Sequence, residues 1–129
     1  MRAASPKRVV LVVEEDPDLR EIIVSYLAMS GWEVTAIDPL PMDASSLDRV
    51  DALVLDVRSL ATAGFRILGD TRARRPELPI VVITSFADAF LSKRVEAMGA
   101  ASVVEKPFSL EDLERALSRL APLVAPTGP

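Results

Sequence analysis

The stretch VVLVVEED, running from Val9 to Asp16, decides the fold. Its five consecutive apolar residues, four of them valines, are followed at once by three acidic ones. A strand that is apolar on both faces is typical of a parallel sheet with helices on both sides. Acidic residues directly after such a strand lie at its carboxyl end, where open α/β sheets bind ligands. The stretch therefore predicts a central strand that ends at a candidate site.

The rest of the chain repeats this pattern of short apolar runs separated by helical segments. Further apolar runs occupy residues 52–55, 80–83 and 102–104, and each reads as a strand buried on both faces. A partly alternating run at 32–37 is typical of a strand at a sheet edge. Helical spacing of apolar residues covers 18–29, 64–75 and 87–98, and a fourth helix starts after Ser109. Two prolines in residues 38–49 favour a loop with only a short helix. Alternating strands and helices predict an α/β fold with a mainly parallel sheet.

Composition excludes several classes of protein. The chain of 129 residues contains no cysteine and no histidine, which excludes a disulfide scaffold, a thiolate metal site and a Ser-His-Asp triad. A net charge of −4 disfavours direct binding to nucleic acid. The longest strongly apolar run is far short of the roughly 20 residues that span a membrane, so we expect a cytoplasmic protein. The length fits one domain at residues 7–120, between an N-terminal tail at 1–6 and a flexible C-terminal tail at 121–129.

Polar side chains follow four of the predicted strands. Glu14 and Glu15 follow the run at 9–13, Asp56 follows 52–55, Thr84 follows 80–83, and Lys106 comes just after 102–104. Each residue alone would fit a turn or a helix cap. Because the carboxyl ends of parallel strands meet at one sheet edge, we expect the five side chains to converge.

The chemistry of this set points to a cation and a phosphoryl group. Clustered carboxylates repel one another unless a cation lies between them, and hard oxygen ligands favour Mg²⁺ or Ca²⁺. A lysine and a hydroxyl opposite would compensate the charge of a transferring phosphoryl group. Asp56 could be the nucleophile, since carboxylates form aspartyl phosphates.

The motifs together resemble the receiver domain of two-component response regulators. The matching stretches are VVLVVEEDPDLR (9–20), DALVLD (51–56), Gly64, LPIVVIT (78–84), Gly99-Ala100 and KPF (106–108), and the resemblance covers residues 7–120. It implies a flavodoxin-like, three-layer (βα)5 fold with a five-stranded parallel sheet in the order 2-1-3-4-5.

The same resemblance implies a role in a phosphorelay. A sensor histidine kinase or a phosphotransfer protein would pass a phosphoryl group to Asp56, and Lys106 and Thr84 would contact that group. Phosphorylation would then switch a surface that a downstream effector protein binds. Homodimerisation is a further possibility that the family offers. Beyond its own phosphotransfer and dephosphorylation, the chain would not be an enzyme.

The resemblance also implies a magnesium site. Glu15 would bind Mg²⁺ directly, Glu14 would bind it through water, and Asp56 and the backbone carbonyl of Arg58 would complete the protein's ligands. The family usually has at least one aspartate in the acidic pair, where this chain has two glutamates. An extra methylene moves a carboxylate outward by about 1.5 Å, so we expect weaker Mg²⁺ binding.

Other departures leave alternatives open. Val103 stands where the family usually has a switching aromatic residue, and Phe86 and Arg58 flank the site. A pseudo-receiver, which keeps the fold as a protein-interaction module without phosphorylation, is therefore the alternative function. A dehalogenase-like phosphatase, which also uses an aspartate nucleophile, would need an acidic residue in place of Arg58.

Overall fold

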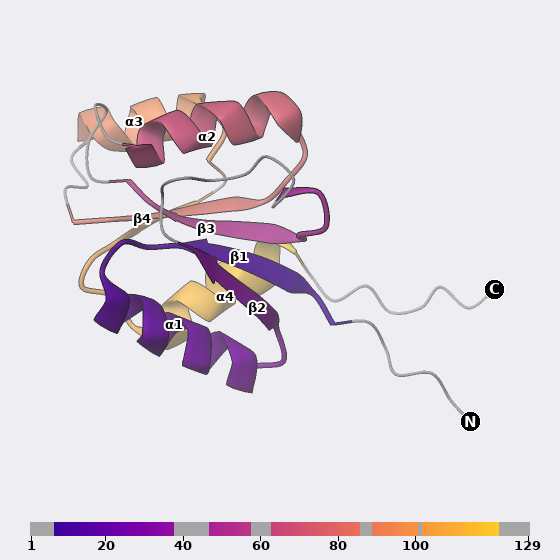
Figure 1. Ribbon diagram of the computed structural model, residues 1–129. Helices are drawn as coiled ribbons and strands as arrows, with labels where there is room; N and C mark the ends of the chain where they lie inside the picture. Colours follow the sequence, from indigo (N-terminus) through magenta and orange to yellow (C-terminus); the bar gives the residue numbers. More distant parts are fainter. Residues whose placement is uncertain (1–6, 38–46, 58–62, 86–88, 101, 122–129) are drawn as a thin grey trace.

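The computed structural model describes residues 7–37, 47–57, 63–85, 89–100 and 102–121 of the chain. Five parallel strands form one sheet in the order β2-β1-β3-β4-β5 (Figure 1). They are β1 (Val9–Val13), β2 (Glu33–Ile37), β3 (Ala52–Asp56), β4 (Ile80–Thr84) and β5 (Ser102–Glu105). The sheet type and the strand order are those predicted.

Helices cover both faces of the sheet and make three layers. The helices of the described residues are α1 (Pro17–Met29), α2 (Ala63–Arg74), α3 (Ala89–Ala97) and α4 (Leu110–Leu120). Figure 1 shows α1 and α4 on one face and α2 and α3 on the other. None of these helices is long and apolar enough to cross a bilayer. Most of the loop predicted at 38–49 and both predicted tails, apart from Ala121, lie outside the described residues.

Three strands extend one residue beyond the apolar runs from which they were predicted. Asp56, Thr84 and Glu105 are the last residues of β3, β4 and β5. Asp56 pairs in register with Ile83, and Thr84 pairs with Glu105, because the backbone ladder continues whatever the side chain is. The polar residues at the strand ends are therefore held by the sheet rather than by loops.

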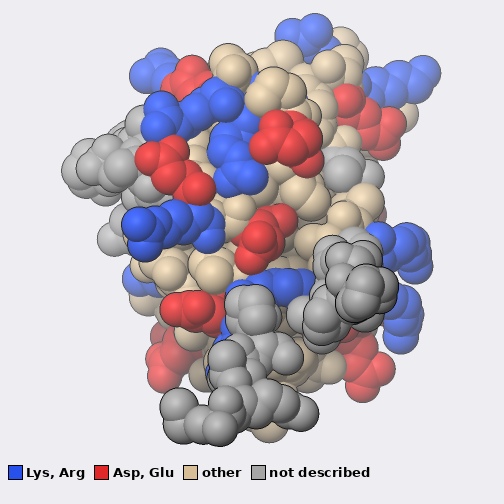
Figure 2. Space-filling view, turned by 90° about the vertical axis from the view of Figure 1, so that its right-hand side faces the viewer, with Lys and Arg blue, Asp and Glu red and all other residues tan. Residues whose placement is uncertain are grey.

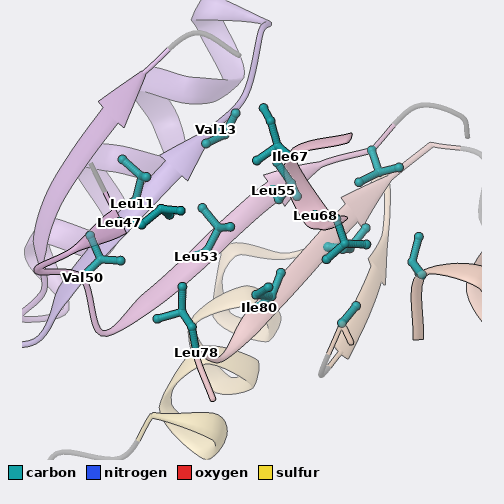
Figure 3. Packing of buried hydrophobic residues seen from close by; sticks show 14 of the residues in the cluster. Leu11, Val13, Leu47, Val50, Leu53, Leu55, Ile67, Leu68, Leu78 and Ile80 are labelled. Carbon is teal, nitrogen blue, oxygen red and sulfur yellow. The ribbon is translucent and has the colours of Figure 1, made fainter. Parts of the chain in front are cut away.

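The sheet separates two hydrophobic cores. Alternate residues of β1, β3 and β4 face one side or the other, as the two-residue period of a strand requires. Leu11, Leu53 and Ile80 pack toward α2 and α3 (Figure 3). Val10, Val54 and Val81 pack toward α1 and α4. The central strands β1, β3 and β4 are thus buried on both faces, as predicted.

The outer strands are less buried. β2 is partly exposed along its length, as expected for a sheet edge. β5 was also predicted to be buried on both faces, but Ser102, Val103 and Val104 are only half-buried. The physical reason is its position, because β5 pairs with β4 alone and has no strand on its other side.

The strands begin at the face opposite their carboxyl ends, where several side chains tie elements together. Across this face positive and negative side chains are interspersed (Figure 2). The Arg8 guanidinium lies 4.1 Å from the Trp32 ring centroid and donates a hydrogen bond of 2.8 Å to the Ala121 carbonyl. Arg75 donates to the carbonyls of Leu47 and Val50, at 2.7 and 2.9 Å. These contacts connect segments that are distant in sequence.

Candidate functional site

The candidate site lies at the carboxyl ends of β1, β3, β4 and β5. Parallel pairing brings these four ends to one edge of the sheet, at the left in Figure 1. Glu14 follows β1 directly, Asp56 and Thr84 end β3 and β4, and Lys106 follows β5. The structure therefore brings together residues that lie up to 92 positions apart in the sequence.

Lys106 connects the two buried carboxyl groups of this edge. Its Nζ lies 3.1 Å from Glu14 Oε2 and 3.3 Å from Asp56 Oδ1. The side chains of Glu14 and Asp56 are 0% and 5% exposed, and that of Lys106 is 18% exposed. Two carboxyl groups thus share one ammonium in a place that water hardly reaches.

Glu14 is held by contacts beyond Lys106. Its Oε1 accepts a hydrogen bond of 3.1 Å from the Asp16 backbone N–H, and its carbonyl oxygen accepts one of 2.8 Å from Arg20. Burial, together with the neighbouring Asp56 charge, raises the pKa of the Glu14 carboxyl, against the opposite effects of the Asp16 N–H and Lys106. Its environment therefore disfavours a further uncompensated negative charge.

The Asp16 side chain begins α1. It accepts hydrogen bonds from the backbone N–H groups of Asp18 and Leu19, at 3.0 and 3.4 Å, and Pro17 is the first residue of the helix. Because the Asp16 N–H also binds Glu14, the start of α1 and the acidic edge of the sheet form one connected unit.

Thr84 is fully buried at the end of β4. Its carbonyl accepts a hydrogen bond of 2.7 Å from the Lys106 backbone N–H, which continues the pairing of β4 with β5. The peptide bond between Lys106 and Pro107 is cis. Thr84 and Lys106 are thus neighbours through their backbones, as the convergence of strand ends predicted.

The remaining predicted site residues are placed differently. Glu15 is exposed, unlike its neighbour Glu14. Val103 lies within β5, in register with Val82, and packs against the core on the α2 and α3 side. Arg58 and Phe86 lie outside the described residues.

The donor set at this edge fits a hard divalent cation in chemistry and charge. Glu14 and Asp56 offer carboxylate oxygens, the ligands that Mg²⁺ prefers, and one ammonium balances only one of their two charges. Among the residues that the structure describes, however, no group of three or more acidic side chains is arranged to hold a metal ion. A metal at this edge would therefore draw on side chains that rearrange or on further ligands such as backbone carbonyls and water.

A pocket of about 530 Å³ lies beside Lys106. Its walls come from the start of α1, from the residue after β4 and from the segment between β5 and α4. They are formed by Asp16, Leu19, Ile22, Ser85, Lys106, Pro107, Phe108 and Leu110. Ile22 is 52% exposed although it is a large apolar residue. An apolar surface thus lies next to the charged edge.

Sequence reasoning missed two contacts of the site. It did not single out Arg20, which binds the Glu14 carbonyl, and it did not pair Glu14 with Lys106. The position of Arg20 in the first turns of a helix that starts beside the acidic run was an available signal. The pairing of two side chains 92 residues apart depends on their conformations, which the strand pattern does not contain.

Comparison with known proteins shows similarity to one family. A family model described as the response regulator receiver domain matches residues 10–118. The chain is 36% identical over 126 residues to the response regulator MprA of Mycobacterium avium, which covers 93% of this chain and 52% of that protein. It is 28% identical over 102 residues to a cyclic di-GMP phosphodiesterase of Thermotoga maritima, 79% of this chain and 28% of that protein. The chain thus spans about half the length of the response regulators it matches.

Solved structures with the same arrangement of elements agree. The non-phosphorylated HemR receiver domain of Leptospira biflexa superposes with a TM-score of 0.79 at 28% identity, covering 95% of this chain and 100% of that one. The chemotaxis protein CheY4 of Vibrio cholerae has a TM-score of 0.80 at 24% identity, covering 89% and 99% of the two chains. The second likeness concerns the fold alone.

Proposed function

Because this chain belongs to the response regulator receiver domain family, we propose that Asp56 is its phosphoacceptor and that the phosphoryl donor is a phosphohistidine of a sensor histidine kinase or a phosphotransfer protein. The observation that carries the proposal is the contact of 3.3 Å between Lys106 Nζ and Asp56 Oδ1 at a nearly buried strand end. A nucleophilic carboxylate beside a positive charge is suited to phosphoryl transfer, because the positive charge stabilises the negative charge on the phosphoryl oxygens.

The proposed step exchanges one bond to phosphorus for another. An oxygen of the Asp56 carboxylate attacks phosphorus and forms an O–P bond while the N–P bond of the phosphohistidine breaks. The electron pair of that bond leaves with the imidazole of the donor, which takes a proton from solvent. Since these 129 residues contain no histidine, the donor histidine lies outside them. Lys106 would stabilise the phosphoryl oxygens, with Thr84 beside it.

We propose Mg²⁺ as the cofactor of this step. Glu15, Asp56 and the backbone carbonyl of Arg58 would hold it, with Glu14 contributing through water. A bound magnesium ion would supply positive charge to the phosphoryl oxygens. The excess of buried carboxyl groups over ammonium groups at this edge supports the proposal.

The proposed partners would use different faces. The donor protein would dock over the pocket beside Lys106, because its apolar wall adjoins the charged edge. A downstream effector would bind the surface around β5, where Val103 would be the switch residue. The same region would also be the interface of a homodimer. We further propose that the chain acts in the cytoplasm without binding nucleic acid itself, and that it has no catalytic activity beyond its own phosphotransfer and dephosphorylation.

Phosphorylation can be tested by intact mass. Incubating the protein with Mg²⁺ and a small phosphodonor such as acetyl phosphate should add one phosphoryl group to the wild type. The Asp56→Ala variant should gain none, because it lacks the proposed nucleophile. Asp70 is exposed on α2, so Asp70→Ala provides a matched control that should still be modified.

Two results would overturn the proposal. An unmodified wild-type protein at millimolar Mg²⁺ would favour the pseudo-receiver, which binds partners without phosphorylation. A phosphoryl group that persists in Asp56→Ala would place the acceptor elsewhere. Omitting Mg²⁺ from the same incubation should abolish the added mass if the cofactor is assigned correctly.

A further inference from the structure

The first turn of α1 contains a positive side chain that the helix itself does not favour. Arg20 lies in this turn, and the amino end of a helix carries the positive end of its dipole. The Arg20 backbone N–H donates a hydrogen bond of 2.9 Å to the Asp16 carbonyl, so the helix fixes the base of the side chain. Because helical side chains lean toward the amino end of their helix, the guanidinium lies back over the segment that joins β1 to α1. The role of Arg20 therefore lies in that segment.

The Arg20 guanidinium holds the peptide group that precedes Glu15. Its Nη1 donates a hydrogen bond of 2.8 Å to the carbonyl oxygen of Glu14, which belongs to the peptide group between Glu14 and Glu15. The peptide group after Glu15 is held as well, because the Asp16 N–H donates to Glu14 Oε1 at 3.1 Å. Two charged side chains thus hold the two peptide groups on either side of Glu15.

Holding both peptide groups determines where the Glu15 side chain points. Each peptide group is planar, so only the φ and ψ angles of Glu15 can vary between them. Both angles are fixed once the two planes are held, and the direction of the bond from Cα to Cβ is fixed with them. The holding groups are themselves secured, because Glu14 is completely buried and Arg20 belongs to a helix that Asp16 caps. The exposed Glu15 side chain thus leaves the backbone in a defined direction.

We propose that Arg20 is a positioning residue for Glu15, which it directs toward the divalent cation of the candidate site. The part that concerns the cation rests on the proposed function, whereas the ordering of Glu15 does not. A guanidinium has no acceptor atom and cannot be a metal ligand, so Arg20 acts through the backbone of the residue before Glu15. Outer groups that orient a metal ligand typically change metal affinity by about 10–100-fold when they are lost.

Positioning and charge predict opposite effects of removing Arg20. A guanidinium next to the acidic edge repels a divalent cation, so the charge by itself weakens Mg²⁺ binding. If Arg20 acted only through its charge, its removal would strengthen Mg²⁺ binding. If Arg20 keeps Glu15 in its direction, the same removal weakens Mg²⁺ binding. The sign of the change in affinity therefore identifies the role.

Titration with MgCl₂ measures this sign. Arg20→Met keeps an unbranched side chain and removes both the charge and the N–H donors. Amide chemical shifts of the isotope-labelled protein should give a Mg²⁺ affinity roughly tenfold lower for this variant than for the wild type. Arg119→Met makes the same change in the last turn of α4, on an exposed residue, and should leave the affinity unchanged. An unchanged or higher affinity in Arg20→Met would overturn the proposal.

The ordering of Glu15 can be measured without any metal. In the metal-free wild type, the backbone order parameters of Glu15 and Asp16 should equal those of a rigid backbone, about 0.85. In Arg20→Met they should fall toward about 0.6, while those within α1 stay unchanged. Low values at Glu15 in the wild type would overturn the proposal without any variant. An equal fall throughout α1 in Arg20→Met would attribute the change to the whole helix and contradict the proposal.

The two proposals fail separately. A wild type that binds Mg²⁺ and is phosphorylated, with an Arg20→Met variant that binds the ion equally well, would overturn the positioning role and leave the proposed function in place. A wild type that binds no Mg²⁺ and takes up no phosphoryl group, but whose Glu15 loses order in Arg20→Met, would support the positioning of Glu15 and overturn the proposed function.

Discussion

Thr71 shows how one side chain can cost stability inside an otherwise apolar helix face. It lies on α2, is completely buried, and its hydroxyl has no hydrogen-bond partner in the part of the chain that the structure describes. A buried hydroxyl that loses its water without gaining a partner costs about 1–3 kcal/mol. Replacing it with an apolar group of similar shape should therefore relieve a penalty.

We accordingly expect Thr71→Val to raise the free energy of unfolding by about 1 kcal/mol. Equilibrium urea denaturation of the wild type and the variant would measure the difference, with an unchanged dependence on urea as the control for two-state behaviour. A decrease in stability would show that the hydroxyl has a partner, such as a bound water.

At the level of single residues, the sequence predicted which polar side chains gather but not how they pair. Asp56, Thr84 and Lys106 follow apolar runs, so their convergence follows from the geometry of a parallel sheet. Glu14 and Glu15 are adjacent in the sequence, yet one is buried and the other exposed. That difference arises because successive residues leaving a strand point in opposite directions, and it decides which glutamate meets Lys106.

Among the elements, two glycines at helix ends make a matched pair. Gly31 and Gly99 follow α1 and α3 with φ angles of 98° and 105°, which residues with a Cβ rarely adopt. A Cβ on Gly31 would meet nothing within 4 Å, whereas one on Gly99 would collide with the Arg72 side chain. Arg72 cannot move freely, because it donates to the carbonyls of Pro76 and Gly99, at 2.6 and 2.5 Å.

We therefore expect Gly31→Ala to cost about 1 kcal/mol through backbone strain alone. Gly99→Ala should cost about 1–2 kcal/mol more, because Arg72 must give up hydrogen bonds as well. Thermal or urea denaturation of both variants would measure this difference. Equal losses would show that Arg72 finds new partners without penalty.

The ends of the elements are where sequence reasoning was least accurate. Hydrophobic runs located every strand, but they stopped one residue early wherever the strand ended in a polar residue such as Asp56 or Thr84. Backbone pairing, which does not depend on hydrophobicity, sets the true end. The start of a capped helix was predicted more accurately than the strand ends. Ser109 accepts a hydrogen bond from the Asp112 N–H, as its position before an acidic first turn predicted.

Across the whole molecule, stability should be graded from the centre of the sheet to its edges. β1, β3 and β4 have a strand on each side and are buried on both faces, whereas β2 and β5 each pair along one side only. In hydrogen exchange, the amides of β3 and β4 should exchange slowest and those of β2 fastest, because local opening at an edge breaks fewer contacts. Uniform exchange across all five strands would contradict this gradient.

The strand order could not be obtained from hydrophobic periodicity. The runs at β1, β3 and β4 look alike, and apolar alternation contains no information on which strands are neighbours. Only the family resemblance supplied the order with β1 between β2 and β3. The partial alternation of apolar residues in β2 predicted correctly that it is an edge strand. The continuous apolar run of β5 gave no sign that it is the other edge strand.

The contact between Arg8 and the Ala121 carbonyl has a consequence for how the domain can be combined with others. It holds the start of β1 beside the end of α4, so the chain enters and leaves the domain at neighbouring points (Figure 1). These points lie at the end of the sheet where the strands begin, whereas Asp56 lies at the end where they finish. A protein fused to either point would leave the acidic edge uncovered, and joining the two points by a short linker would suit circular permutation. The points where the chain enters and leaves the domain thus lie at the opposite end of the sheet from the candidate site.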